Sequence, residues 1–167
     1  TEWRDSWEGV GFPGIINHGV PGTLTRRMTE EAKRFHDLPE ETKLSIPVTR
    51  DQKGYVPARY GVTTHSEFHE SKKLDTVECL VVATDYPRDN PNVAAGKQFY
   101  GPMPWLPEEA LPGFRAVAEE YMATITALGK SLLPVWARAL ELDADFFADK
   151  FDPAYTYFRM AHYPPKP

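Results

Sequence analysis

The longest regular pattern in the chain lies in residues 111–142, which read LPGFRAVAEEYMATITALGKSLLPVWARALEL. Its apolar side chains recur every three or four positions, the spacing of a helix with one buried face. Pro112 and Gly113 stand where a helix can begin, and Pro134 predicts a kink because it removes one backbone donor. The pattern therefore predicts a long central helix that needs a large apolar partner. Its apolar stripe comprises Phe114, Val117, Ala118, Tyr121, Met122, Ile125, Leu128, Leu132, Leu133, Trp136, Ala137 and Leu140.

The chain beyond the central helix is expected to end in a strand. Asp143 and Asp145 interrupt the helical pattern and can start a short second helix that carries Phe146 and Phe147. Residues 155–162 are rich in aromatic residues and predict a strand, which enters the proline-rich sequence YPPKP.

The first half of the chain alternates apolar segments with turn residues. Residues 2–9 predict a helix with Trp3 and Trp7 on one face, and residues 11–21 predict a short strand with a buried apolar centre. A second helix begins at Thr23 and stops at Leu38-Pro39, and Pro39 starts another helical turn. The remaining segments are an irregular loop over 47–74, a strand over 76–84, and a loop over 85–107 whose Phe99, Tyr100 and Trp105 should pack on the body.

Composition narrows the class of protein. A chain of 167 residues predicts one domain, and a net charge of −5 without long like-charge blocks argues against binding to nucleic acid or to anionic membranes. No apolar run is long enough to span a bilayer, and the charged start of the chain does not read as a signal peptide. The single cysteine, Cys79, excludes an internal disulfide framework and favours a cytoplasmic location.

The histidines offer one candidate metal site. His65, Glu67 and His69 alternate within a polar loop and could chelate an ion from one strand face, although solvated side chains are the more common reading of such a cluster. His18 and His36 are expected to be structural: His18 can satisfy backbone groups at a turn, and His36 ends a helix, where a cation is favoured. Cys79, in an apolar run, reads as a small buried hydrophobe. No nucleophile, phosphate loop or dinucleotide fingerprint is present.

Several stretches, in order along the chain, carry a resemblance to a known family. They are GF at 11–12, INHGVP at 16–21, FHDLPEETK at 35–43, GYVP at 54–57, VE at 77–78, GPMPWLP at 101–107, LPGFR at 111–115 and RMAHYPP at 159–165. Each is weak alone, but the ordered set resembles the isopenicillin N synthase-like family of non-haem Fe(II) and 2-oxoglutarate-dependent oxygenases.

The resemblance implies a fold of the α+β class. Residues 1–153 would form a mostly helical N-terminal region with a long central helix and a few strands. Residues 154–167 would form the first strand and the proline-rich entry into a catalytic double-stranded β-helix, a jelly-roll barrel that is mostly absent from this chain. The N-terminal region is expected to contact that barrel, and the sequence is expected to continue beyond Pro167.

The resemblance also implies the cofactors Fe(II) and 2-oxoglutarate. The family binds iron through a His-x-Asp pair and a distant His, and holds the oxoacid through an Arg-x-Ser pair. None of these motifs lies in residues 1–167, so no catalytic or metal-binding residue is assigned in this stretch. Residues 1–167 alone are therefore predicted to be inactive and to bind neither cofactor tightly. They are also predicted to form no stable monomer, because the apolar stripe of the central helix would lack the barrel as its partner.

A few site residues are carried over from the family. Tyr163 matches a residue that hydrogen-bonds the co-substrate, and Arg159, on the same strand face, would point into the barrel. Ala161 stands where plant members have Asn, so that polar contact is lacking here. Tyr55, Gln52 and Lys53 match a region that helps to cover the substrate in relatives.

The function that follows is oxidation of a small organic molecule, by hydroxylation, desaturation or cyclisation. Two alternatives remain open from the sequence. One is a non-catalytic helical interaction module that retains an oxygenase-like scaffold. The other is a small metalloprotein that uses His65, Glu67 and His69.

Overall fold

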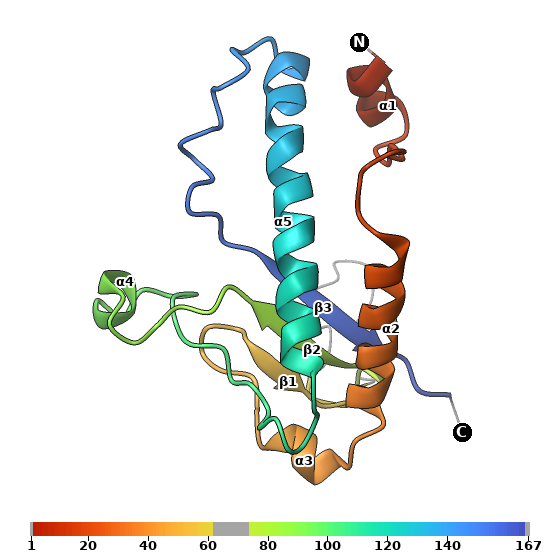
Figure 1. Cartoon of the computed structure of the whole chain (residues 1–167), viewed down its shortest axis with the longest axis vertical. Helices are drawn as coiled ribbons and strands as arrows, with labels where there is room; N and C mark the ends of the chain where they lie inside the picture. Colours follow the sequence, from red (N-terminus) through yellow and green to blue (C-terminus); the bar gives the residue numbers. More distant parts are fainter. Residues whose placement is uncertain (1, 62–73, 166–167) are drawn as a thin grey trace.

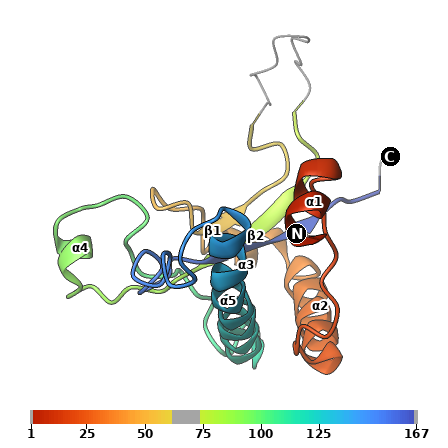
Figure 2. The ribbon, with the colours of Figure 1, turned by 90° about the horizontal axis from the view of Figure 1, so that it is seen from above.

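The computed structural model of the protein describes residues 2–61 and 74–165. Regular elements alternate with long connections, and three strands form one sheet beside two packed helices (Figures 1 and 2). In chain order the elements are α1 (Glu2–Gly9), α2 (Gly22–His36), α3 (Glu40–Leu44), β1 (Gly54–Val56), β2 (Glu78–Ala83), α4 (Pro91–Ala94), α5 (Phe114–Ala139) and β3 (Tyr157–His162).

Helix α5 is the predicted central helix, and it is slightly shorter at each end than the sequence pattern suggested. Gly113 precedes it with a left-handed φ of 79°, a conformation that favours glycine, and the helix continues through Pro134. Helix α2 runs beside its first half in the opposite direction (Figure 1). At the far end of α5, Trp136 packs on Trp3 and Trp7 of α1, with ring centroids 5.5 and 4.6 Å away. The predicted aromatic face of α1 therefore covers the end of α5.

The sheet has the order β1-β2-β3, and both pairings are antiparallel. Tyr55 pairs with Leu80, and Leu80 pairs with Met160, so these three side chains share one face of the sheet. That face packs on α2 and on the first turns of α5, where Phe35 stacks on Phe114 at 5.9 Å. The core buried between helices and sheet consists of Met28, Phe35, Ile46, Tyr55, Leu80, Val82, Met103, Leu106, Leu111, Phe114, Val117, Ala118 and Met160.

The sequence pattern does not predict strand β1, because the strand lies in a polar stretch typical of a loop. Its start depends on Gly54, which has φ 112°. A Cβ atom there would lie 2.6 Å from the carbonyl oxygen of Pro47 and 2.8 Å from that of Ile46. Only glycine permits this approach, which lets the amide of Tyr55 donate to the Ile46 carbonyl at 2.8 Å. The sequence feature that indicates β1 is therefore Gly54, and not an alternation of apolar residues.

The strand predicted over residues 11–21 is wrong. This segment forms turns and irregular backbone, and Phe12 and Ile16 are 88% and 84% exposed instead of buried. Asn17 and Gly19 adopt positive φ values of 56° and 76°, which turn the chain away from an extended path. No strand among the described residues pairs with it, so its backbone groups have no ladder to join.

One further expectation about helices fails. Residues 144–151 form successive turns instead of a second helix, with hydrogen bonds from Phe146 to Asp143 and from Ala148 to Asp145. Such bonds span three residues and do not build a continuous α-helix. The apolar stripe of α5, which was expected to need a large apolar partner, is only partly covered, since Ile125 is 39% and Leu140 is 58% exposed. The described residues therefore leave part of this stripe open to solvent.

The long connection over residues 85–107 folds back on the body, as predicted. This loop includes the short helix α4, which Asn90 caps by accepting from the amide of Asn92. Trp105 packs against the core, and its indole donates to Asp85 Oδ2 at 3.2 Å. Tyr100 packs on Tyr86 with ring centroids 4.8 Å apart. The aromatic residues thus anchor the loop.

No helix among residues 2–61 and 74–165 is both long and apolar enough to cross a membrane.

Candidate functional site

The sheet presents two faces of opposite character. The face with Leu80 and Met160 is covered by α2 and α5, whereas the side chains that alternate with them on β3 are exposed. Tyr157 is 64% exposed, and Arg159 and Ala161 are exposed as well. The face that carries Tyr157, Arg159 and Ala161 is called the open face below.

A hollow of about 920 Å³ lies over the open face. Its lining combines apolar and aromatic walls with two arginines, and no carboxylate or histidine is among the described residues that line it. A surface of this kind suits an organic molecule that carries a negative charge. The lining residues are Val48, Thr49, Arg50, Gln52, Val56, Tyr60, Cys79, Val81, Phe99, Tyr155, Tyr157 and Arg159.

Arg159 is the central polar side chain of this hollow. It extends from the middle of β3, opposite Val81 of β2, and its Nη2 lies 3.3 Å from Cys79 Sγ. Arg50, which also lines the hollow, donates instead to the carbonyl of Gly96 at 3.1 Å. Within the described part of the chain Arg159 forms no ion pair, so its guanidinium is available to an anion.

The three residues predicted to cover a substrate separate in the structure. Gln52, with φ 58°, is exposed and lines the hollow. Lys53 is fully buried, and its Nζ donates to the carbonyls of Thr84 and Gly101, each at 2.6 Å. Burial lowers the pKa of Lys53, although Asp51 and Asp85 oppose that shift.

Tyr55, the third of these residues, is 1% exposed and donates to Glu78 on the covered face. Burial raises the pKa of its hydroxyl, and the hydrogen bond with Glu78 adds to the shift. Lys53 and Tyr55 thus hold the loops and the sheet together in the interior. Of the three residues, the structure leaves Gln52 in a position to touch a ligand in the hollow.

Glu78 is the centre of a buried polar cluster on the covered face. Its Oε2 accepts from Lys43 Nζ at 2.9 Å and from the Tyr55 hydroxyl, and its Oε1 faces His36 and His162. Burial opposes ionisation of this carboxyl, but hydrogen bonds from His162, Tyr55 and Lys43 outweigh it. They lower the pKa of Glu78 from 4.5 to about 2. The cluster is therefore built around a carboxylate that stays charged.

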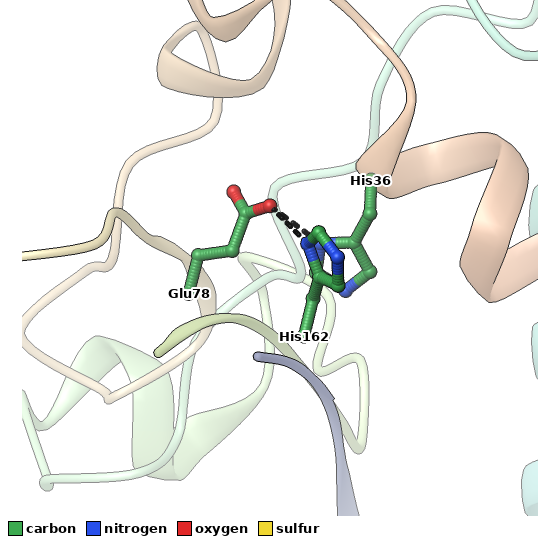
Figure 3. A group of neighbouring side chains, drawn as sticks. All are labelled: His36, Glu78 and His162. Atoms are coloured by element: carbon green, nitrogen blue, oxygen red, sulfur yellow. Dashed lines mark hydrogen bonds and ion pairs between the residues drawn. The ribbon is translucent and has the colours of Figure 1, made fainter. Parts of the chain in front are cut away.

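His36 and His162 approach the same carboxylate oxygen from two elements, as Figure 3 shows. His36 is the last residue of α2, and His162 is the last residue of β3. Their Nδ1 atoms lie 3.3 and 2.8 Å from Glu78 Oε1. From the sequence a cation was expected at His36, but burial lowers its pKa, with Glu78 only partly compensating. Desolvation thus outweighs the favourable position at a helix end.

The structure also places the remaining residues that the sequence singled out, except those outside the described residues. Tyr163 follows β3 directly and is 73% exposed, so its co-substrate role stays a prediction. His65, Glu67 and His69 lie outside the described residues. Cys79 is 2% exposed, as expected of a buried thiol. His18 is structural as predicted, since its Nδ1 accepts from the amide of Val20 at 3.2 Å.

The grouping of His36, Glu78 and His162 was missed from the sequence. Each residue stood in a different stretch, and His162 is separated from Glu78 by 84 positions. One signal was available in hindsight: Glu78 is a charged residue at the start of an apolar strand, and a buried carboxylate requires partners. The identity of those partners depends on the antiparallel register of β2 and β3, in which Glu78 pairs with His162.

Comparison with known proteins places the chain in a family. Residues 1–108 match the family model described as non-haem dioxygenase in morphine synthesis N-terminal. Because this match covers more than half of the chain, the protein belongs to the non-haem dioxygenase family and carries its N-terminal region. The sequence-based resemblance is thereby confirmed.

Individual relatives agree with this class. The chain is 33% identical over 133 residues to azadirone synthase of Melia azedarach, a match that covers 80% of this chain and 38% of the relative. It is 30% identical over 169 residues to the 2-oxoglutarate-Fe(II) type oxidoreductase hxnY of Emericella nidulans, covering 98% of this chain and 46% of the relative. The chain thus spans less than half the length of these two relatives.

Solved structures agree in fold. A crystal structure of a 2OG-Fe(II) oxygenase family protein from Caulobacter crescentus superposes on 89% of this chain and 46% of its own, with a TM-score of 0.71 and 24% identity. The mixture of helices and a few strands that the sequence predicted is therefore an architecture shared with part of a 2-oxoglutarate oxygenase.

Proposed function

We propose that this chain is the N-terminal part of an Fe(II)- and 2-oxoglutarate-dependent oxygenase that oxidises a small organic molecule. The family assignment supports the class of reaction, and a relative matched along nearly the whole chain carries these two cofactors in its name. One observation of the structure supports the proposal for this chain in particular. It is the open face of the sheet, where Arg159 stands unpaired among the described residues within an apolar and aromatic hollow.

The residues of the hollow fit an organic anion and do not fit the iron itself. Arginine and glutamine side chains can bind a carboxylate or another oxygen-rich group, whereas the iron ligands of such enzymes are imidazoles and carboxylates. The described lining contains neither of the latter. We therefore propose that the iron ligands lie outside the described lining of this hollow.

The hollow would act by binding and orientation. Iron with 2-oxoglutarate would supply the oxidising chemistry. Arg159 would fix an anionic group of substrate or co-substrate, and Gln52 would hydrogen-bond a polar group. Outside the lining of the hollow, Tyr163 would donate a hydrogen bond to a co-substrate oxygen. The aromatic walls, including Tyr157 and Phe99, would exclude water from an apolar body. Whether the product is hydroxylated, desaturated or cyclised is a property of the complete site.

The proposal is tested with the complete protein, supplied with Fe(II), 2-oxoglutarate and a panel of small organic acids and neutral small organic molecules. Succinate release coupled to substrate oxidation is expected. Absence of turnover with the whole panel, together with absence of iron from the purified protein, would refute it. In that case the alternative of a non-catalytic interaction module would gain support.

The role of Arg159 has its own test. Arg159→Leu should raise the KM for the anionic ligand about 10- to 100-fold, because a charge-assisted hydrogen bond is lost. The matched control is Arg26→Leu, an exposed arginine on α2. Equal KM values for the two variants would remove Arg159 from the site.

A further inference from the structure

The cluster of His36, Glu78 and His162 has a geometry that a salt bridge alone does not explain. One nitrogen from each imidazole and one carboxylate oxygen all lie within 4.8 Å of one another (Figure 3). The three residues come from the end of α2, the start of β2 and the end of β3. Two neutral imidazoles and one carboxylate form a ligand set that transition metals use.

His36 is held in the tautomer that a metal ligand requires. Its Nε2 lies 3.1 Å from the carbonyl oxygen of Met160, and a carbonyl can only accept, so Nε2 carries the hydrogen. The lone pair of a neutral ring is then on Nδ1. This pattern, in which the second ring nitrogen donates to a backbone carbonyl, is the usual support of a metal-bound histidine.

The Nδ1 atom of His36 has no hydrogen-bond partner among the described residues. Its side chain is 6% exposed, and Nδ1 is a buried polar atom without a donor or acceptor in bonding geometry. It faces Glu78 Oε1 at 3.3 Å, so two lone pairs point toward one space. A buried acceptor in this position is costly unless a cation lies between the two atoms.

The two oxygens of Glu78 have separate partners. Lys43 and Tyr55 bind Oε2, which leaves Oε1 to the two histidines. His162 Nδ1 is 2.8 Å from Oε1, and its side chain is 44% exposed. Its ring hydrogen can therefore move to Nε2 on the solvent side when Nδ1 binds a metal. His162 also offers the path by which an ion would enter from solvent.

We propose that His36 Nδ1, Glu78 Oε1 and His162 Nδ1 bind one divalent transition metal of the zinc type. The separations of 3.3 and 2.8 Å from Oε1 to the two nitrogens lie close to the distance between ligands of a tetrahedral zinc site. That distance is about 3.3 Å for metal–ligand bonds of about 2.0 Å. The metal ties the end of α2 to β2 and β3, and the site does not depend on the proposed oxygenase activity.

The neighbouring charge of Lys43 selects among metals. Its ammonium already balances the carboxylate, so affinity has to come from the imidazole nitrogens. Magnesium and calcium prefer oxygen ligands in larger number and are disfavoured here. Zinc and cobalt accept nitrogen ligands in tetrahedral geometry and suit the cluster.

The test measures zinc in the complete protein after treatment with a chelator and dialysis. Wild-type protein should bind one more equivalent of Zn²⁺ per chain than the His162→Asn variant. Any metal held at the iron site is common to both proteins and does not change this difference. Zinc should raise the thermal midpoint of the wild type by about 3 to 5 °C at a free concentration about 100 times the dissociation constant. His18→Asn, at an exposed histidine outside the cluster, is the control and should behave as the wild type.

A second measurement identifies the ligands. X-ray absorption at the zinc edge should show nitrogen and oxygen neighbours at about 2.0 Å. It should show no sulfur, because Cys79 lines the hollow on the open face. His36→Asn should lose the same equivalent of zinc. Equal zinc content and equal thermal shifts in wild type, His162→Asn and His36→Asn would overturn the proposal. Succinate release, measured in parallel with iron, reports separately on the oxygenase function.

Discussion

The two faces of the three-stranded sheet differ in what they do for the molecule. On the covered face Leu80 and Val82 are fully buried and Met160 is 7% exposed. On the open face of the same strands, Tyr157 is 64% exposed and Arg159 lines a hollow. The same backbone register serves both faces, because successive side chains of a strand point in opposite directions. One face therefore contributes to the free energy of folding, whereas the other stays exposed among the described residues.

The polar residues follow the same division. Glu78 is surrounded by four side chains of the described residues on the covered face. Arg159 on the open face is paired with none of the described carboxylates. A charged group is buried in the folded protein only when other groups pair with it, whereas an exposed charge is solvated by water and can bind a ligand. The contrast is between a buried charge surrounded by protein groups and an exposed charge without an ionic partner among the described residues.

The largest effect on stability is expected for a substitution on the covered face. Leu80→Ala should lower the free energy of unfolding by about 3 to 4 kcal/mol, since a fully buried leucine is replaced by a cavity. The control is Val81→Ala on the neighbouring open-face position, which is only partly buried and should cost less than half as much. Urea unfolding of the complete protein measures both. Equal losses would show that the open face is covered in the complete protein as tightly as the other.

A similar decrease in the free energy of unfolding is expected when the pH is lowered. The folded pKa of Glu78, about 2, is below its ordinary value of 4.5, so the folded state binds its proton less readily than the unfolded chain. This contribution, about 3 kcal/mol, is complete above pH 4.5 and is lost as the pH falls toward 2.

The acid effect is measured by urea unfolding of chelator-treated protein between about pH 6 and about pH 3, a range chosen around the unfolded pKa. Glu78→Gln should flatten the pH dependence, whereas Glu109→Gln, at an exposed position, should leave it unchanged. A wild-type curve as flat as that of Glu78→Gln would contradict the hydrogen bonding of the carboxylate.

The smallest effect on stability is expected for a substitution on the open face. Arg159→Leu should change the free energy of unfolding by no more than about 0.5 kcal/mol, because the side chain is exposed and has no ion pair among the described residues. The same variant is expected to lose ligand affinity. A loss of stability as large as that of Leu80→Ala would make Arg159 a structural residue.

Much of the architecture could be predicted from local pattern. The three- and four-residue spacing of α2 and α5, the proline and acidic residues that begin α3, and the apolar run of β2 are each properties of a few neighbouring residues. The strand over residues 11–21 failed for the complementary reason. Its pattern was apolar, but a strand forms only where another strand accepts its hydrogen bonds.

The candidate sites required distant residues to meet. Gln52 and Arg159 were singled out by resemblance, and the structure places both at one hollow. Tyr55 and Lys53 were singled out in the same way, yet the alternation of β1 and the loop before it turns them into the interior. Adjacent residues of one motif thus received opposite roles, which sequence similarity alone does not distinguish.

The sequence by itself determined the family and the positions of the main helices and of strands β2 and β3. These depend on local spacing, on turn residues and on motifs in order. Only the tertiary structure decided that His36, Glu78 and His162 converge and that Arg159 faces an open hollow. The meeting of Glu78 with His162 and the position of Arg159 follow from the antiparallel register of β2 and β3, with Glu78 opposite His162 and Val81 opposite Arg159. His36 joins them from the end of α2. A shift of one residue in that register would exchange the two faces, because side chains alternate with a period of two.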